Sequence, residues 1–165
     1  MSQPSPPAGV VVDCMVFVQA VANESGPAAR ILDLLDERKI TVYVSKLVLS
    51  EARYVLARPD VRLNLRNITY IAVEALFERL TQRATLIRQV PRRFVYQRDP
   101  NDEPYINLAV ATKADYLVSR DNDLLDLMRW DTEEGRAFQQ RFRFLKVVTP
   151  EVLLTEIEAN IQQPL

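Results

Sequence analysis

Five short β-branched runs alternate with helical segments along the chain, and this alternation constrains the fold more than any other feature. The runs cover residues 10–12, 40–44, 85–90, 115–119 and 144–148. The first, Val10–Val12, is an unbroken apolar run, which is typical of a strand buried on both faces. Strands that alternate with helices form parallel sheets covered by helices. The sequence therefore predicts a three-layer α/β/α sandwich around a mostly parallel five-stranded sheet.

The segments between these runs have helical patterns with capping residues. We predict helices over residues 14–22, 25–37, 45–56, 69–83, 102–113, 121–128 and from 149 onward. Ser25, Ser45 and Thr149 are the expected N-caps, since their hydroxyls can accept a hydrogen bond from the first turn. Pro59 is expected to stop the helix that starts at Ser45.

The chain is predicted to form one domain over residues 9–160, because its 165 residues suit a single core and no linker or repeat divides it. Residues 1–8 are proline-rich and are expected to be a disordered tail. No apolar run approaches the roughly 20 residues that cross a bilayer, and the N-terminus lacks the pattern of a secretory signal. We therefore expect a cytoplasmic protein without a membrane segment.

The composition excludes several kinds of catalytic site. There are 0 histidines and 1 cysteine, so His-based triads, histidine-ligated zinc, thiolate metal cages and internal disulfides are ruled out. The 3 glycines form no glycine-rich nucleotide loop. The net charge is −1, so no global basic field attracts nucleic acid. Any catalyst must rely on carboxylates, arginines, hydroxyls and a bound ion.

Acids lie at the predicted carboxyl ends of the strands, where open α/β sheets bind their ligands. Asp13 ends the first strand, Asp121 lies two residues past the fourth, and Asp102 begins a helix. Two unit charges about 4 Å apart repel by roughly 4 kcal/mol at an effective dielectric constant of about 20. Converging carboxylates must therefore share protons or hold a divalent cation. Oxygen ligands without histidine or cysteine suit Mg²⁺ or Mn²⁺, whose waters can attack a phosphodiester.

Glu51 lies on the apolar face of its predicted helix. By i, i+3, i+4 spacing that face holds Leu47, Val48, Glu51, Ala52 and Val55. An isolated carboxylate against packed surface is costly, so Glu51 needs a compensating partner. The sequence leaves open a functional site, a partly exposed glutamate, or a pair with a distant arginine.

Four segments resemble the PIN domain family, typified by the VapC toxins of bacterial toxin–antitoxin pairs. These segments are Val10–Asp13, Ser50–Leu56, Asp99–Ala111 and Ala114–Leu125. The resemblance extends over about residues 10–155 and implies the strand order 3-2-1-4-5. It also implies a Mg²⁺- or Mn²⁺-dependent endoribonuclease with an RNA substrate, an antitoxin protein as partner, and a homodimer.

Carried over position by position, the resemblance implies a set of site residues. The catalytic acids would be Asp13, Glu51, Asp102 and Asp121, the metal ligands Asp13, Asp102 and Asp121, and the accessory residues Ser119, Asn122 and Asp123. Asp99 or Glu103 stays open in place of Asp102. Cys14–Met15 stands where the family often has Thr-Asn, which removes a hydroxyl and an amide beside the first acid. Asn122 could substitute for them.

A basic stretch precedes the third acid. Its arginines are Arg88, Arg92, Arg93 and Arg98, and no acid occurs from Thr85 to Arg98. Guanidinium groups bind phosphates in a bidentate fashion, and Phe94 and Tyr96 between them could stack on bases. We therefore regard the four arginines as candidate RNA-binding residues. A solvated loop with ordinary arginines is the alternative.

Two classes of protein that phosphorylate an aspartate are alternatives to the nuclease. An aspartyl-phosphate phosphatase needs an aspartate where Met15 stands, and a receiver domain needs a Lys-Pro pair where Lys146 is followed by Val147. Both are disfavoured. A non-catalytic PIN-fold RNA-binding or scaffold module remains the alternative, because Cys14–Met15 departs from the family pattern.

Overall fold

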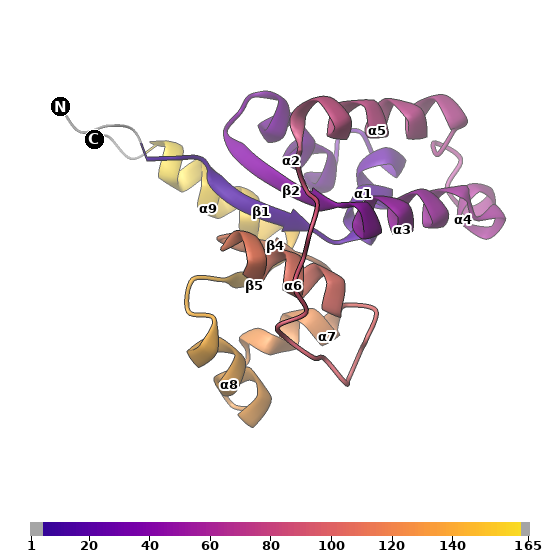
Figure 1. Ribbon diagram of the computed structural model, residues 1–165. Helices are drawn as coiled ribbons and strands as arrows, with labels where there is room; N and C mark the ends of the chain where they lie inside the picture. The colour runs from indigo at the N-terminus through magenta and orange to yellow at the C-terminus, as the bar shows by residue number, and fades with distance from the viewer. Residues whose placement is uncertain (1–4, 163–165) are drawn as a thin grey trace.

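The computed structural model describes residues 5–162 and contains a five-stranded sheet with helices on both faces (Figure 1). The strands are β1 (Ala8–Val12), β2 (Ile40–Ser45), β3 (Thr85–Ile87), β4 (Tyr116–Val118) and β5 (Lys146–Val148). Their order is β3-β2-β1-β4-β5, and each neighbouring pair is parallel. The predicted α/β fold and the strand order are confirmed.

The helices form two layers, one on each face of the sheet. They are α1 (Cys14–Ala22), α2 (Pro27–Asp36), α3 (Lys46–Ala57), α4 (Pro59–Asn64), α5 (Tyr70–Arg83), α6 (Glu103–Thr112), α7 (Asn122–Leu125), α8 (Glu133–Arg141) and α9 (Pro150–Gln162). Helices α1, α2, α3 and α5 pack together on one face, where α9 joins α2, and α6 packs on β1, β2 and β4 (Figure 1). Right-handed crossovers explain this division. The chain moves from β1 outward to β3 and then returns past β1 to β4 and β5, so α6, the helix of that return, lies on the opposite face of the sheet.

The central strand β1 lies at the core of the molecule. Val10 and Val11 are fully buried, as are Val42 on β2 and Leu117 on β4. Burial on both faces explains why β1 ends in the uninterrupted valine run Val10–Val12. The acid that ends this run is therefore held at a rigid position in the middle of the sheet edge.

Two of the three predicted N-caps are confirmed. The Ser45 hydroxyl accepts a hydrogen bond from Val48 N at 3.1 Å, and the Thr149 hydroxyl accepts one from Val152 N at 3.3 Å. Ser25 was wrong, because Gly26 is the N-cap of α2 and the Ser25 hydroxyl bonds Asn23 instead.

Several predicted boundaries differ from the structure. The strand expected over residues 85–90 ends at Ile87, because its partner β2 ends at Ser45 and offers nothing further to pair with. Pro59 follows the end of α3, as expected, and also begins the unpredicted α4. The helix expected over 121–128 divides into α7 and a 3₁₀ turn, Asp126–Met128. Helix α8 was missed, since it is polar and has few apolar residues to show a period.

The predicted tail, residues 1–8, falls partly outside the described residues, and Ala8 already belongs to β1. The domain bounds of 9–160 stay a prediction, and α9 runs to Gln162. None of the described helices combines the length and the apolar character that a membrane span requires.

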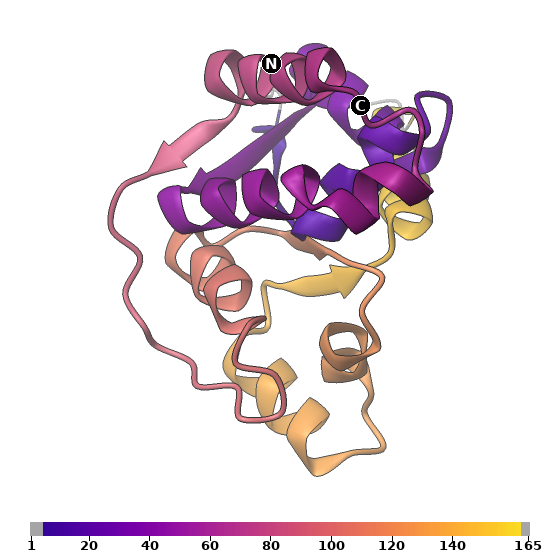
Figure 2. The same cartoon turned by 90° about the vertical axis from the view of Figure 1, so that its right-hand side faces the viewer.

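The segment between β3 and α6 runs along the outside of the molecule (Figure 2). Asn107 on α6 holds this segment, because its Oδ1 accepts hydrogen bonds from Arg93 N and Phe94 N, both at 2.9 Å. Its Nδ2 donates to the Phe94 carbonyl at 3.0 Å. Asn107 is 4% exposed, so these bonds are shielded from water.

The same segment contributes to a small aromatic core beside α8. Phe94 packs against Tyr96, Phe138 and Phe142 with ring centroids 5.3–5.9 Å apart. Tyr96 is 1% exposed, and its hydroxyl donates to the Asp123 carbonyl. The expectation that Tyr96 stacks on bases was therefore wrong, while Phe94 is half-buried and takes part in the same packing.

We predict that Asn107→Ala lowers the free energy of unfolding by about 2–4 kcal/mol, because buried backbone groups of Arg93 and Phe94 lose their partners. Urea unfolding followed by circular dichroism measures the change. Gln97→Ala, an exposed position in the same segment, is the control and should stay within about 0.5 kcal/mol of the wild type. Equal effects of the two substitutions would contradict the role given to Asn107.

Candidate active site

A cleft of about 430 Å³ lies at the carboxyl ends of β1 and β4. Five acids line it, and they are Asp13, Glu51, Asp99, Asp102 and Asp121. The four predicted catalytic acids therefore lie together, although they are far apart in the sequence. This position is the one at which open α/β sheets bind ligands.

Ser119 connects the two central strand ends. Its hydroxyl donates to Asp13 Oδ2 at 2.7 Å and accepts from Asp121 N at 3.0 Å. Asp13 Oδ1 also accepts a hydrogen bond from Met15 N at 3.4 Å, and this bond caps the N-terminus of α1. Burial raises the pKa of Asp13, the bonds from Ser119 and Met15 oppose the rise, and the negative charges of Asp121 and Glu51 add to it. Asp13 is thus held in place and disfavoured as an isolated anion.

Glu51 is compensated by a hydroxyl from the opposite side of the cleft. Tyr105 on α6 is 1% exposed, and its hydroxyl donates to Glu51 Oε2. This contact answers the question that the sequence left open about the partner of Glu51. Burial, followed by the neighbouring acid groups, raises the pKa of Tyr105, so the phenol remains a donor. Leu47 was wrongly placed on the buried face of α3, since it is 61% exposed.

Asp102 lies at the centre of a tight carboxylate group. Asp99, Asp102, Asp121 and Asp123 each offer a carboxylate oxygen, and these oxygens lie within 4.8 Å of one another. Asp102 is 6% exposed, and its Oδ2 is buried without a hydrogen-bond partner among the described residues. Burial first, and then the charges of Asp121 and Asp99, raise the pKa of Asp102 to about 8. A buried oxygen without a donor, in an all-oxygen set, fits a hard divalent cation.

The predicted accessory residues differ in their surroundings. Ser119 has the central role described above, and Asp123 N donates to Asp121 Oδ1 at 2.9 Å. The Asp123 side chain accepts from Arg98 Nε at 2.7 Å, and Arg98 also pairs with Asp126 at 2.7 Å. Asn122 is exposed and does not line the cleft, so no contact among the described residues supports its substitution for the family's Thr-Asn.

The predicted RNA-binding arginines divide into two kinds. Arg98 is held by carboxylates, and Arg92 forms a bidentate pair with Glu103 at 2.8 and 3.2 Å. Arg88 and Arg93 are exposed, and neither forms an ion pair in the described chain. The Glu103 carboxylate is neutralised by Arg92 and does not line the cleft, so Glu103 does not take the place of Asp102 in the acid set.

Tyr105 and Arg120 are cleft residues whose roles the sequence analysis missed. No sequence pattern distinguishes Tyr105 from other tyrosines of the core, and only its three-dimensional contact with Glu51 reveals its role. Arg120 also lines the cleft, where its guanidinium pairs with Glu151 and donates to Gln19 at 2.7 Å. Its position between Ser119 and Asp121 in the sequence was the signal that could have identified it.

Comparison with known proteins agrees with this geometry. The PIN domain family matches residues 9–123. A protein of Methanocaldococcus jannaschii, "Uncharacterized protein MJ1680", is 31% identical over 153 residues, which cover 92% of this chain and 93% of that protein. The match contains the acids at positions 13, 51, 102 and 121. The chain therefore belongs to the PIN domain family, whose members are generally nucleases.

Proposed function

We propose that this protein is a metal-dependent endoribonuclease that hydrolyses RNA phosphodiester bonds in the acid cleft. The observation that carries the proposal is the buried, unpartnered Oδ2 of Asp102, with the oxygens of three further aspartates within 4.8 Å. Arg98 neutralises Asp123, but Asp99, Asp102 and Asp121 have no ion pair among the described residues, and their mutual repulsion is costly. A bound cation would remove that cost.

Mg²⁺ or Mn²⁺ is the proposed cofactor, because both prefer carboxylate oxygens. Asp102 and Asp121 would hold it, with Asp13 as the third predicted ligand and Asp99 as a neighbour in the same cleft. Asp123 is a weaker candidate, since Arg98 already neutralises its carboxylate. When bound, such an ion lowers the pKa of a coordinated water and offsets the negative charge that develops on the phosphate.

The chain's own residues would orient the reacting groups. Ser119 fixes Asp13 and the backbone of Asp121 through one hydroxyl, so the two acids keep their spacing. Glu51 is the proposed acceptor of the proton from the attacking water, since Tyr105 holds Oε2 and Oε1 has no hydrogen bond to a described residue.

The complete acid set favours an enzyme over the scaffold alternative, despite Cys14–Met15. The finer assignments rest on the resemblance alone. We propose on that basis that the protein is the toxin of a toxin–antitoxin pair, with an antitoxin protein as partner, a homodimeric state and a cytoplasmic location. An open reading frame for a small protein next to its gene would support the pairing.

We predict that the purified protein cleaves single-stranded RNA with Mn²⁺ or Mg²⁺ and loses the activity in EDTA. Asp13→Asn and Asp102→Asn should each lower the rate by about 100-fold or more, because each removes a ligand. Electrophoresis of end-labelled RNA measures the rate. The control is Asp131→Asn, an exposed aspartate paired with Arg129 outside the cleft, which should cleave normally. Cleavage that survives EDTA or the Asp102 substitution would disprove the assigned site.

We also predict a pH-dependent stability that originates from Asp102. Its pKa rises from 3.8 to about 8 on folding, so the folded protein binds the extra proton between these values. In EDTA the free energy of unfolding should therefore decline as the pH rises from about 4 to about 8, and Asp102→Asn should flatten this decline. Urea titrations at several pH values measure both. If the free energy of unfolding changed with pH in the same way in the wild type and in Asp102→Asn, the Asp102 proton would not be linked to folding.

A further inference from the structure

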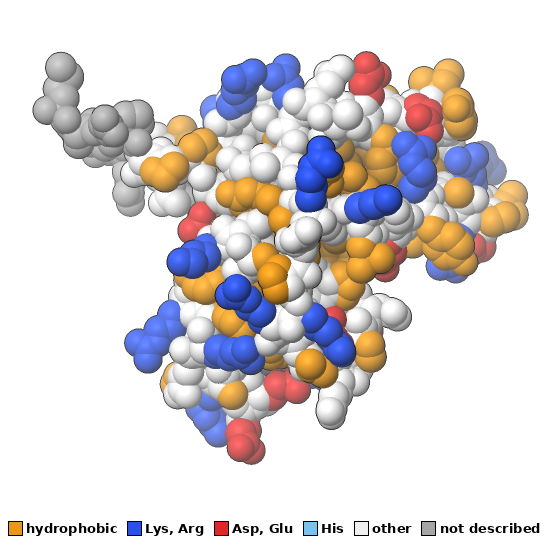
Figure 3. Space-filling model, in the orientation of Figure 1, with side chains coloured by type: hydrophobic (Ala, Val, Ile, Leu, Met, Phe, Trp, Pro, Cys, Tyr) orange, Lys and Arg blue, Asp and Glu red, His pale blue; other side chains and the backbone are white. Residues whose placement is uncertain are grey.

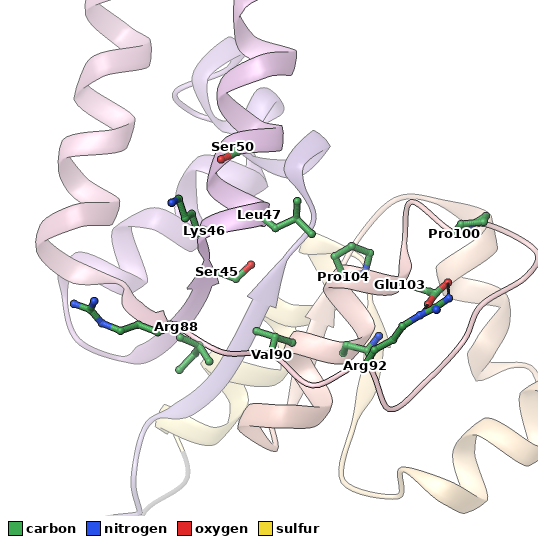
Figure 4. A pocket seen from close by; sticks show the side chains of 12 residues that line it. Ser45, Lys46, Leu47, Ser50, Arg88, Val90, Arg92, Pro100, Glu103 and Pro104 are labelled. Atoms are coloured by element: carbon green, nitrogen blue, oxygen red, sulfur yellow. Dashed lines mark hydrogen bonds and ion pairs between the residues drawn. The ribbon is translucent and has the colours of Figure 1, made fainter.

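A second hollow lies beside the acid cleft, at the carboxyl ends of β2 and β3 (Figure 4). Its volume of about 780 Å³ is typical of sites that bind small ligands. We call it the side groove and define it by six of its lining residues, which are Lys46, Leu47, Ser50, Arg88, Val90 and Pro104. The proposed cleavage chemistry uses none of these six side chains.

The side groove combines an apolar lining with two unpaired cations. Leu47 is 61% exposed, and Val90 and Pro104 are half-buried, so apolar surface is open to solvent there. Lys46 and Arg88 are exposed and form no ion pair with any residue of the described chain. Figure 3 shows lysine and arginine side chains next to apolar ones on the face that Figure 1 presents.

The remaining charged residues that line this hollow, Arg92 and Glu103, neutralise each other. Figure 4 shows Arg92 turned toward Glu103, away from Lys46 and Arg88, and their bidentate pair has distances of 2.8 and 3.2 Å. The groove therefore carries a net charge of about +2 at neutral pH from Lys46 and Arg88. Because the whole chain has a net charge of −1, this local positive charge is not a consequence of composition.

The side groove and the acid cleft share their walls. Ser50 on α3 lines the groove, and the next residue, Glu51, lines the cleft. At the start of α6, Pro104 faces the groove while Asp102 and Tyr105 line the cleft. The groove and the cleft are therefore neighbouring hollows.

A third hollow, of about 440 Å³, continues the path beyond Lys46 and Arg88. These two residues and Ser50 line both hollows, so the cations stand between them. Leu86 on β3 is 47% exposed and lines the third hollow. Apolar surface therefore alternates with cationic groups along the path that leads away from the acids.

We propose that the side groove binds single-stranded RNA next to the bond that is cut, with a base against Leu47 and Val90 and phosphates on Lys46 and Arg88. This inference rests on the proposed nuclease function. A cationic groove with apolar contacts for bases is how proteins hold single strands, and a duplex keeps its bases stacked inside. The groove would thus extend the binding surface for the single-stranded substrate beyond the acid cleft.

Binding of a fluorescein-labelled single-stranded RNA of about 12 nucleotides, measured by anisotropy in EDTA, tests the proposal without cleavage. Lys46→Gln with Arg88→Gln should weaken binding about 10- to 30-fold at 0.1 M salt and make the slope of log K against log salt shallower by about 1.4. Leu47→Ser should weaken binding about three- to tenfold with an unchanged slope, because it removes an apolar contact only. The same RNA annealed to its complement should bind more weakly than the single strand.

The matched control is Arg66→Gln with Arg143→Gln, which removes two exposed arginines that do not line the groove. It should bind RNA within about twofold of the wild type, although its net charge equals that of the groove variant. Equal losses in the two double variants would overturn the proposal, since only the overall charge would then matter. Competition by polyglutamate as strong as by unlabelled RNA would also overturn it, because the site would then bind any polyanion.

Cleavage assays separate this inference from the proposed function. If Mn²⁺-dependent cleavage occurs and the groove variant keeps a normal KM, the groove assignment fails while the nuclease stands. If the groove variant loses RNA affinity but no RNA is cut under any metal condition, the groove assignment stands and the nuclease fails.

Discussion

The crowding of carboxylates at one edge of the sheet is the constraint on which the rest of the site depends. Every acid but Asp102 accepts a hydrogen bond or pairs with a cation. Asp13 has the Ser119 hydroxyl, Glu51 the Tyr105 hydroxyl and Asp123 the Arg98 guanidinium, while Asp99 and Asp121 accept from the backbone N–H groups of Asn101 and Asp123. Asp102 has no such partner for its buried Oδ2 among the described residues. Because an unpaired buried acceptor is costly, Asp102 is the position among these acids at which the proposed cation would contribute most.

The sheet topology makes this crowding unavoidable. Central β1 has β4 as its neighbour, so Asp13 and Ser119 meet across 106 residues of sequence. Helix α6 lies across β1, β2 and β4 on the other face from α3. Its N-cap Asp102 and, in its first turn, Tyr105 join the cleft from that side. The acids therefore approach from both layers of helices.

Much of this arrangement was predictable from the sequence, because strand alternation and acids after strands are local patterns. The hydrogen-bond and ion-pair partners of those acids were not predictable. Tyr105 resembles any half-polar core residue until α6 is placed against α3, and Arg92 and Arg98 appeared free because their carboxylates are more than ten residues away. Leu47 fits the apolar period of α3 but lies beyond the packed layer, over the side groove. Side-chain pairing depends on tertiary contacts that no local pattern encodes.

Cys14 and Met15 alter the surroundings of the acids without removing any of them. Cys14 is 3% exposed, and burial, then the charges of Glu51 and Asp13, raises the pKa of its thiol to about 12. The thiol therefore stays neutral and gives the cleft an apolar wall, to which Met15 adds a half-exposed thioether. A Thr-Asn pair at these positions could donate hydrogen bonds to the carboxylates or hold water against them. An apolar pair instead makes their negative charge more costly, so the proposed cation should stabilise this site more than it would a site with Thr-Asn.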